Sequence, residues 1–291
     1  MHAGEIVGDS ITLTAPGKLN LHLGIYEGRD ERGYHRADSI MVAIALYDEV
    51  TVSAADAVSV NTTPELDVPE RRTVVARAAR ALAAEFGITT GAQIDVVRHI
   101  PDKSGLGSAS TDAATAIRAL CALWGIDSAD PRVVSVARGV GADVAFFLDP
   151  VPSWLDGVGN RLREEFPPLP NVPVVLVRPV GGVSTPEAYA EFDRLPTAPA
   201  DPSAMCDALR ASDVRAVAAA LFNNLEPPAC RIEPEEATVV EWLRAHPGIM
   251  AAQVTGSGSC TFGLCESAEV AARVADEALE RGWWACATHT I

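Results

Sequence analysis

The sequence predicts an α+β protein of two domains. Short segments rich in β-branched residues, several with alternating polar and apolar positions, are typical of strands. Longer Ala- and Leu-rich stretches between them have the periodicity of amphipathic helices. The 291 residues suffice for two domains with sizeable cores. A proline-rich stretch between residues 149 and 173 predicts the junction, so we expect one domain over residues 1–155 and another over residues 156–291.

The first strands are expected near the N-terminus. Residues 10–14 alternate as a strand, and the Ala-Pro-Gly sequence that ends at Gly17 is expected to break it. Alternation resumes over residues 19–23. Residues 39–46 are apolar, and residues 48–52 are predicted to form the next strand.

Two helices in this half have recognisable ends. Residues 73–86 form an amphipathic helix that Gly87 is expected to stop. Asp130 and Pro131 are typical of an N-cap and a first helical position, and the helix that they open is expected to end in the glycines of residues 139–143.

A strand and a helix flank the most informative stretch of the chain. Residues 93–99 are predicted to form the strand, and the Ala- and Leu-rich residues 113–124 the helix. Ser110 or Thr111 is the expected N-cap, with Asp112 in the first turn, where a negative side chain suits the helix dipole.

The loop between this strand and helix predicts an anion site. A helix N-terminus offers backbone N–H groups, and Gly105 and Gly107 let a phosphate approach the main chain. The alternative is a plain Gly-Ser turn that only joins two elements.

In the C-terminal half, a helix is expected to open at Ser184-Thr-Pro-Glu187. The periodicity predicts strands over residues 172–177, 251–254, 260–265 and 283–288, and helices over residues 204–222, 234–245 and 268–281.

Charge and composition limit the classes of partner. The formal net charge of −16 argues against nucleic acid or an anionic membrane, because both require a basic face. No apolar run approaches the roughly 18 residues of a membrane span. The first ten residues lack a basic-then-apolar signal pattern, so we expect the cytoplasm. The six cysteines are widely spaced, which favours reduced core thiols over a zinc site.

Four further residues suggest a catalytic site. Lys18, Asn20 and His22 alternate with leucines, so they are expected on one face of the strand. This polar face either lines a site or is a solvent-facing sheet edge. Asp143 lies between a glycine-rich turn and five apolar residues. Its carboxylate is either a general base or the partner of a lysine, or else it only caps a helix or turn. The 23 basic residues include only two lysines, Lys18 and Lys103. Gly-Ser loops, isolated lysines and one such carboxylate suit phosphoryl transfer to a hydroxyl.

The motifs of the chain resemble those of the GHMP kinases, the family of galactokinase, homoserine kinase and mevalonate kinase. The glycine loop Pro-x-x-x-Gly-Leu-Gly-Ser-x-Ser, which starts at Pro101, carries the family resemblance. One branch of the family is matched more specifically, in order along nearly the whole chain, by residues 15–23, 33–35, 48–52, 141–144, 184–186 and 255–258.

This resemblance implies a fold and an activity. The fold is the two-domain GHMP kinase architecture, with an N-terminal ribosomal-protein-S5-like α/β domain and a C-terminal ferredoxin-like α/β sandwich. The activity is transfer of the γ-phosphate of ATP to a tertiary hydroxyl of a cytidine-diphosphate sugar alcohol, in the methylerythritol phosphate route to isoprenoid precursors. Mg²⁺ is expected to arrive with ATP, without a carboxylate cage of its own. The expected assembly is a monomer or a homodimer.

The resemblance also implies roles for individual residues. Lys18 and Asp143 are the expected catalytic pair. The ATP-binding residues are expected to be Pro101, Asp102, Lys103, Ser104, Gly105, Leu106, Gly107, Ser108, Ala109, Ser110 and Thr111. The substrate-binding residues are expected to be Asn20, Tyr34, His35, Thr185, Pro186, Tyr189, Gly256, Ser257 and Gly258.

The chain departs from the branch at three places. Ser108 and Ala109 stand where glycines are usual, Thr73 stands where an asparagine near the adenine is usual, and Asp149-Pro150 replaces a pair of glycines. These departures bear on nucleotide affinity and base preference. Two alternatives therefore accompany the main expectation: a GHMP kinase for another small alcohol, and a catalytically inactive ligand sensor on the same fold.

Overall fold

The computed structural model describes residues 5–7 and 10–291, which divide into two compact units. Both units are discontinuous in sequence. Unit 1 contains the described residues up to Gly17, Leu46–Pro101 and Gly107–Pro150, and unit 2 contains Lys18–Ala45, Asp102–Leu106 and Val151–Ile291. Because both units are made of separate segments, this division does not test the predicted domain boundary between residues 155 and 156. That boundary stays a prediction. The expectation about a signal pattern in the first ten residues falls mostly outside the described residues.

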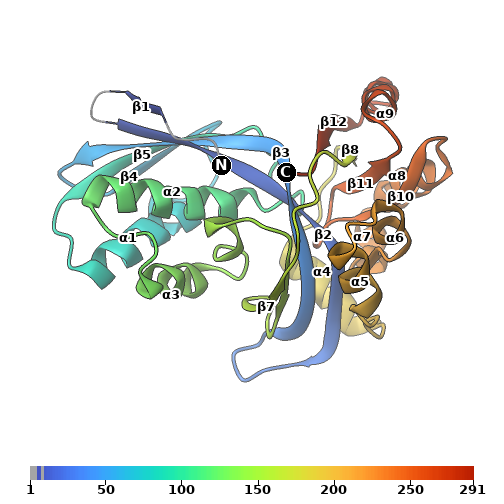
Figure 1. Ribbon diagram of the computed structural model, residues 1–291, viewed down its shortest axis with the longest axis horizontal. Coiled ribbons are helices and arrows are strands. Elements are labelled where there is room, and N and C mark those ends of the chain that lie inside the picture. Colours follow the sequence, from blue (N-terminus) through green and yellow to red (C-terminus); the bar gives the residue numbers. More distant parts are fainter. Residues whose placement is uncertain (1–4, 8–9) are drawn as a thin grey trace. The chain divides into compact units, whose positions relative to one another are not determined.

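Unit 1 is built on a sheet with three helices against it (Figure 1). The strand order is β1-β2-β3-β5-β4, where the long strands β2 and β3 also supply residues to unit 2. β3 runs antiparallel to β5, and β4 runs parallel to β5. The bounds are β1 (Glu5–Val7), β2 (Ser10–Arg29), β3 (His35–Ala55), β4 (Ser59–Thr63) and β5 (Gly91–Val97).

The helices of unit 1 are mostly capped as the sequence predicts. Thr73 accepts a hydrogen bond from the amide of Ala76 at the start of α1, and Gly87 ends that helix in the left-handed region. Asp130 caps α3, which begins at Pro131. The bounds are η1 (Glu70–Arg72), α1 (Val74–Phe86), α2 (Ser108–Trp124), α3 (Pro131–Val140) and η2 (Phe146–Leu148).

The predicted start of α2 is wrong. The helix begins at Ser108, five residues before the expected start, and its N-cap is Gly107 with φ 85°. Ser110 and Thr111 therefore lie inside the helix, and Asp112 lies beyond its first turn. Only a residue that tolerates a positive φ fits this N-cap readily, and glycine does so without a steric penalty.

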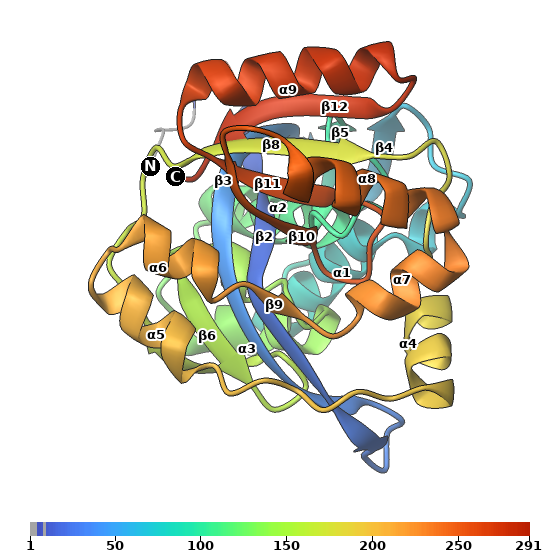
Figure 2. The same cartoon turned by 90° about the vertical axis from the view of Figure 1, so that its right-hand side faces the viewer.

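Unit 2 contains an antiparallel sheet in the order β10-β11-β8-β12. Two of its helices, α8 and α9, pack against this sheet, and α9 lies along β12 (Figure 2). Their shared core is apolar and includes Val175, Val177, Leu243, Val274 and Trp283. The bounds are β8 (Pro173–Arg178), α8 (Pro234–Ala245), β10 (Ile249–Val254), β11 (Thr261–Cys265), α9 (Ala268–Glu280) and β12 (Trp284–His289).

The rest of unit 2 surrounds the parts of β2 and β3 that belong to it. β6 pairs with β3, β7 pairs with β6, and β9 runs parallel to β2 with Phe222 opposite His22. Helices α4 to α7 complete the unit. The bounds are β6 (Ser153–Asp156), β7 (Arg161–Glu165), α4 (Thr185–Arg194), α5 (Ser203–Arg210), α6 (Val214–Ala219), β9 (Phe222–Asn223) and α7 (Glu226–Ile232).

Two local predictions are corrected here. β2 runs without a break through Pro16 and Gly17. The helix expected over residues 204–222 is divided into α5 and α6, because Asp213 caps a new helix. The proline-rich stretch from residue 149 to 173, where the domain junction is predicted, holds β6 and β7.

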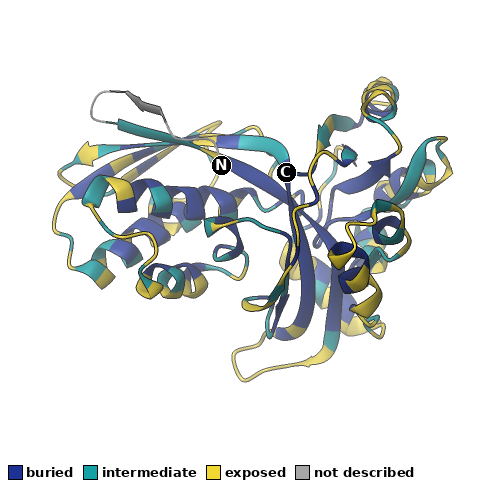
Figure 3. Cartoon of the chain, in the orientation of Figure 1, coloured by how far each residue is buried: buried dark blue, intermediate teal, exposed yellow. Residues whose placement is uncertain are grey.

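Burial follows this architecture (Figure 3). The β2 segment that contains Lys18, Asn20 and His22 is buried, with each of these residues 3% exposed or less. Among the residues described, none of the helices is long and apolar enough to cross a membrane. The six cysteines all carry free thiols.

Candidate functional site

Two glycine loops touch each other within unit 2. Gly105 has φ +74°, and a Cβ atom built there would lie 2.1 Å from the carbonyl oxygen of Thr255. The amide of Ser259 donates a hydrogen bond to the carbonyl of Lys103 at 3.0 Å. Since no side chain fits in the space at Gly105, glycine is required for this contact.

Lys18 lies beside this contact. Its backbone amide donates to the carbonyl of Leu106 at 2.9 Å, and its ammonium donates to the side-chain oxygen of Asn20. A Cβ atom at Gly256 would lie 3.3 Å from the Lys18 Nζ atom. The structure therefore brings the predicted residues Lys18, Asn20, Gly105 and Gly256 together.

The polar face of β2 is buried, so the alternative of a solvent-facing edge is wrong. The Asn20 side chain donates to the hydroxyl of Ser39 at 2.9 Å, and its backbone amide donates to the hydroxyl of Thr255 at 3.1 Å. Burial lowers the pKa of His22 to about 4, against the opposing effect of Asp38 and Asp201. His22 is therefore neutral near pH 7.

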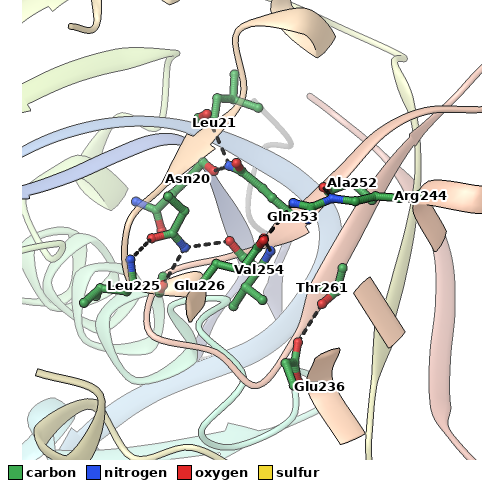
Figure 4. A network of polar contacts seen from close by, with 12 residues as sticks. Asn20, Leu21, Leu225, Glu226, Glu236, Arg244, Ala252, Gln253, Val254 and Thr261 are labelled. Carbon is green, nitrogen blue, oxygen red and sulfur yellow. Dashed lines mark hydrogen bonds and ion pairs between the residues drawn. The ribbon is translucent and has the colours of Figure 1, made fainter. Parts of the chain in front are cut away.

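A network of amide side chains holds the second glycine loop (Figure 4). Asn223 donates from one nitrogen to the carbonyls of Val254 at 2.7 Å and Gly256 at 2.9 Å. Gln253 donates to the backbone carbonyl of Asn20 at 2.9 Å. Sequence reasoning missed Asn223 and Gln253, because isolated amide residues carry no motif. The one sequence feature that could have pointed to them is an amide side chain within a short, mostly apolar segment.

Helix α4 carries three of the predicted substrate-binding residues. Ser184 caps this helix through a capping box with Glu187, as the sequence predicts. Thr185 is its first residue, and its hydroxyl lies 2.9 Å from the hydroxyl of Ser257. This contact joins the start of α4 to the Gly256–Gly258 loop. Pro186 and Tyr189 follow in the same helix.

His35 is buried against α4. Its Nδ1 atom lies 2.8 Å from the carbonyl oxygen of Tyr26, and its Nε2 atom lies 3.0 Å from a carboxylate oxygen of Asp193. The imidazole centroid lies 5.5 Å from that of Tyr189. Tyr34, by contrast, is 59% exposed. The predicted residues His35 and Tyr189 are thus in contact, and the exposed side chain of Tyr34 is next to His35 in the sequence.

The remaining predicted nucleotide residues belong to unit 1 and form the start of α2. The amides of Ser110 and Thr111 both donate to the carbonyl of Gly107. By helix geometry, the amides of Ser108 and Ala109 have no acceptor inside the helix. They are the groups that a helix N-terminus presents to an anion.

Asp143 lies in the turn after α3. It is half-buried, so its burial alone does not require a paired cation. The guanidinium of Arg77 donates to the carbonyl of Val140 at 3.1 Å, where α3 ends three residues before Asp143. Lys18 and Asp143 belong to different units, and their pairing stays a prediction.

A hollow of about 440 Å³ opens beside Thr73 in unit 1. Its lining mixes apolar, polar and acidic residues: Ser59, Val60, Asn61, Thr62, Glu65, Leu66, Val68, Glu70 and Thr73. Its size and lining suit a flat heterocycle. In the described part of the chain, no three His, Cys, Asp or Glu side chains come together as a metal site.

Comparison with known sequences identifies a family. A model of the GHMP kinases N terminal domain matches residues 73–149, and a model of the GHMP kinases C terminal matches residues 205–282. A curated 4-diphosphocytidyl-2-C-methyl-D-erythritol kinase of Desulfitobacterium hafniense is 34% identical over 287 residues, which cover 98% of each chain. The kinase of that name from Ruegeria pomeroyi is 37% identical over 94% of this chain and 97% of its own length.

Solved structures agree with the sequence matches. A crystal structure of 4-(cytidine 5'-diphospho)-2C-methyl-D-erythritol kinase has a TM-score of 0.78 at 32% identity, with 96% of this chain and 98% of that chain covered. A homoserine kinase from Cytophaga hutchinsonii has a TM-score of 0.77 at 19% identity over 99% of this chain and 96% of its own, which is a likeness of fold alone. The predicted two-domain fold is confirmed, and the chain belongs to the GHMP kinase family.

Proposed function

We propose that the chain transfers the γ-phosphoryl group of ATP to the 2-hydroxyl of 4-diphosphocytidyl-2-C-methyl-D-erythritol. This reaction belongs to the methylerythritol phosphate pathway of isoprenoid precursor biosynthesis. The observation that carries the proposal is the match, over 94–98% of the chain, to curated kinases named for this substrate. The buried Lys18, the two touching glycine loops and the His35–Tyr189 contact support the proposal.

Asp143 and Lys18 are the proposed catalytic residues. The Asp143 carboxylate takes the proton of the 2-hydroxyl as that oxygen attacks the γ-phosphorus atom, and the bond to the bridging oxygen of ADP breaks. The Lys18 ammonium stabilises the negative charge that develops on the attacking oxygen. The hydrogen bond from Lys18 to Asn20 supports this role, because it orients the ammonium beside the glycine loops.

ATP is proposed to bind along residues 101–111, with its phosphates on the backbone amides at the start of α2. The hollow beside Thr73 suits the adenine ring. Mg²⁺, when bound to the phosphates, offsets their charge. The Ser104 hydroxyl in this segment is an oxygen ligand, the type that Mg²⁺ prefers.

The cytidine end of the acceptor is proposed to bind where α4 meets the hairpin between β2 and β3. Tyr34, His35 and Tyr189 are the aromatic rings available to a pyrimidine. Asn20, Thr185 and Pro186 are proposed to line the sugar alcohol, and Gly256, Ser257 and Gly258 its phosphates. The hydroxyl contact between Thr185 and Ser257 supports one continuous lining.

The cellular setting is also a proposal. Free thiols at all six cysteines are consistent with a reducing compartment, and we propose the cytoplasm. A monomer or a homodimer is the proposed assembly.

The proposal is tested by ADP release measured across a panel of alcohols. We expect turnover with 4-diphosphocytidyl-2-C-methyl-D-erythritol, and background rates with the 4-phosphate that lacks cytidine, with homoserine and with mevalonate. Turnover of a different alcohol at the higher rate would identify another GHMP kinase. Ligand binding without turnover of any alcohol would identify an inactive sensor.

A further inference from the structure

The start of α2 is tied to a buried carboxylate on β3. Asp48 is 0% exposed, and each of its oxygens accepts hydrogen bonds. Oδ1 accepts from the backbone amides of His99 at 2.6 Å and Ile100 at 2.7 Å, and Oδ2 accepts from the hydroxyl of Ser108 at 2.8 Å. All these residues belong to unit 1.

The Ser108 hydroxyl has no proton left to donate to a phosphate. It donates its one proton to Asp48 and accepts a hydrogen bond from the guanidinium of Arg98 at 2.8 Å. The Arg98 Nε atom lies 3.8 Å from a carboxylate oxygen of Asp112, and both of these side chains are at most 5% exposed. The serine side chain therefore faces the interior of unit 1, so only its backbone amide remains for a phosphate.

The arrangement fixes both ends of one chain segment. His99 and Ile100 precede Pro101, and Ser108 begins α2, so Asp48 holds the residues on either side of residues 101–107. A buried carboxylate is tolerated when several donors satisfy it, and here two amides and a hydroxyl do so. Arg98 places a positive charge one hydrogen bond away.

Ser108 supplies the hydroxyl of this link. It is the serine of the GHMP kinase loop that starts at Pro101, whereas the branch described above usually has glycine here, which has no hydroxyl to donate. The buried Asp48–Ser108–Arg98 contacts therefore account for a departure that the phosphate chemistry alone does not.

We propose that Asp48 is a positioning residue for the nucleotide, acting through Ser108. It sets the distance between Ile100 and the N-terminus of α2, and so the direction in which the Ser108 and Ala109 amides point. This inference rests on the proposed function, in which those amides bind the phosphates of ATP.

The test compares Ser108→Ala with Ser108→Thr and with the control Ser128→Ala, a matched change at an exposed serine in the turn after α2. ATP affinity is measured by calorimetry without an acceptor, and KM for ATP and for the cytidyl alcohol by ADP release. We expect Ser108→Ala to weaken ATP binding about three- to tenfold, the effect of one hydrogen bond, and to leave KM for the alcohol unchanged. Ser108→Thr should recover most of the loss, because it keeps a hydroxyl.

Asp48→Asn extends the test. The asparagine amide keeps an oxygen that accepts from the amides of His99 and Ile100. Its NH₂ group, however, is a donor and cannot accept the hydrogen bond from the Ser108 hydroxyl, so ATP affinity should again fall. The inference is overturned if Ser108→Ala lowers the thermal midpoint and leaves ATP affinity at the wild-type value, or if KM for the alcohol rises as much as KM for ATP. Because calorimetry needs no acceptor, an absence of turnover on the cytidyl alcohol would refute the proposed function without deciding this inference, which the ATP titrations decide.

Discussion

The imidazole of His35 lies 3.0 Å from the carboxylate of Asp193. Asp193 also accepts hydrogen bonds from the guanidinium of Arg29, at 3.1 Å from its Nε atom. Asp193 is on α4, whereas His35 and Arg29 flank the hairpin between β2 and β3. Because the other ring nitrogen faces the carbonyl of Tyr26, both nitrogens of His35 face protein oxygens. The ring therefore joins α4 to the hairpin between β2 and β3.

Asp193→Asn should weaken binding of the cytidyl alcohol while leaving KM for ATP unchanged. The Asp193 side chain is 39% exposed, so solvent screens this contact. We therefore expect KM for the alcohol to rise only about two- to fivefold. Steady-state kinetics with each substrate varied in turn measures the effect. Asp207→Asn, which removes an exposed carboxylate paired with Arg210, is the control. Equal increases in both KM values would contradict the prediction.

Arg77→Met should lower kcat without changing either KM. The Arg77 guanidinium holds the carbonyl of Val140, three residues before Asp143, and a misplaced base slows the chemical step. We expect a loss of roughly tenfold or more. Arg80→Met is the matched control, because Arg80 lies one turn further along α1 and pairs with Glu70 at the surface. A kcat that falls equally in both variants would show that the effect is not specific to Arg77.

Gly105→Ala should inactivate and destabilise the protein. A methyl group there would meet the carbonyl oxygen of Thr255 at 2.1 Å, in addition to the strain of a positive φ. Gly125→Ala separates these two costs, since Gly125 also has a positive φ, +67°, but a Cβ atom there meets nothing within 4 Å. The control should lose about 1 kcal/mol of unfolding free energy, and Gly105→Ala several times as much. Urea unfolding of both variants checks this, and equal losses would be inconsistent with the contact.

Glu236→Gln should change the pH dependence of stability. Burial raises the pKa of Glu236 from its ordinary value of 4.5 to about 7, against the effect of the hydrogen bond from Thr261 at 2.6 Å. Between these pH values the folded state binds a proton that the unfolded state releases. The contribution of Glu236 to stability is therefore present at low pH and is lost as the pH rises from 4.5 through 7.

Glutamine keeps the oxygen for Thr261 but does not titrate. The unfolding free energy of Glu236→Gln relative to wild type should thus rise by about 3 kcal/mol between pH 5 and pH 8. Urea unfolding at both pH values measures this difference. Parallel pH profiles for the two proteins would mean that Glu236 titrates normally.

Helices whose ends are set by residues close to them in the chain could be predicted from the sequence. Thr73 and Gly87 mark the ends of α1, and Ser184 with Glu187 marks the start of α4. In these cases the capping group and the backbone that it satisfies lie within a few residues. The glycine loop at Gly105 could be recognised as a motif, but its contact with Thr255 could not be predicted.

Predictions failed where distant residues decide the structure. β2 continues through Pro16, which has no N–H group, since a strand accommodates proline at a position where the ladder needs no donor. The early start of α2 depends on Gly107 and on the contact between Ser108 and Asp48, sixty residues apart. No local pattern reports such a contact.

The candidate site shows the same division. Lys18, Asn20 and His35 were predicted, because the residues around them form motifs. Asn223 and Asp193 were missed, since each acts through one or two groups that are remote in sequence. Such positioning residues have no characteristic spacing and are found only in the folded chain.

The most direct test of the account is identification of the product by phosphorus NMR. With ATP, Mg²⁺ and 4-diphosphocytidyl-2-C-methyl-D-erythritol, the wild-type protein should form ADP and one new phosphomonoester in equal amounts, coupled to no proton because the 2-hydroxyl is tertiary. Asp143→Asn, which keeps the shape of the side chain but removes the base, should form neither at a comparable rate. A protein that releases ADP without this phosphomonoester, or an Asp143→Asn variant as active as wild type, would contradict the account.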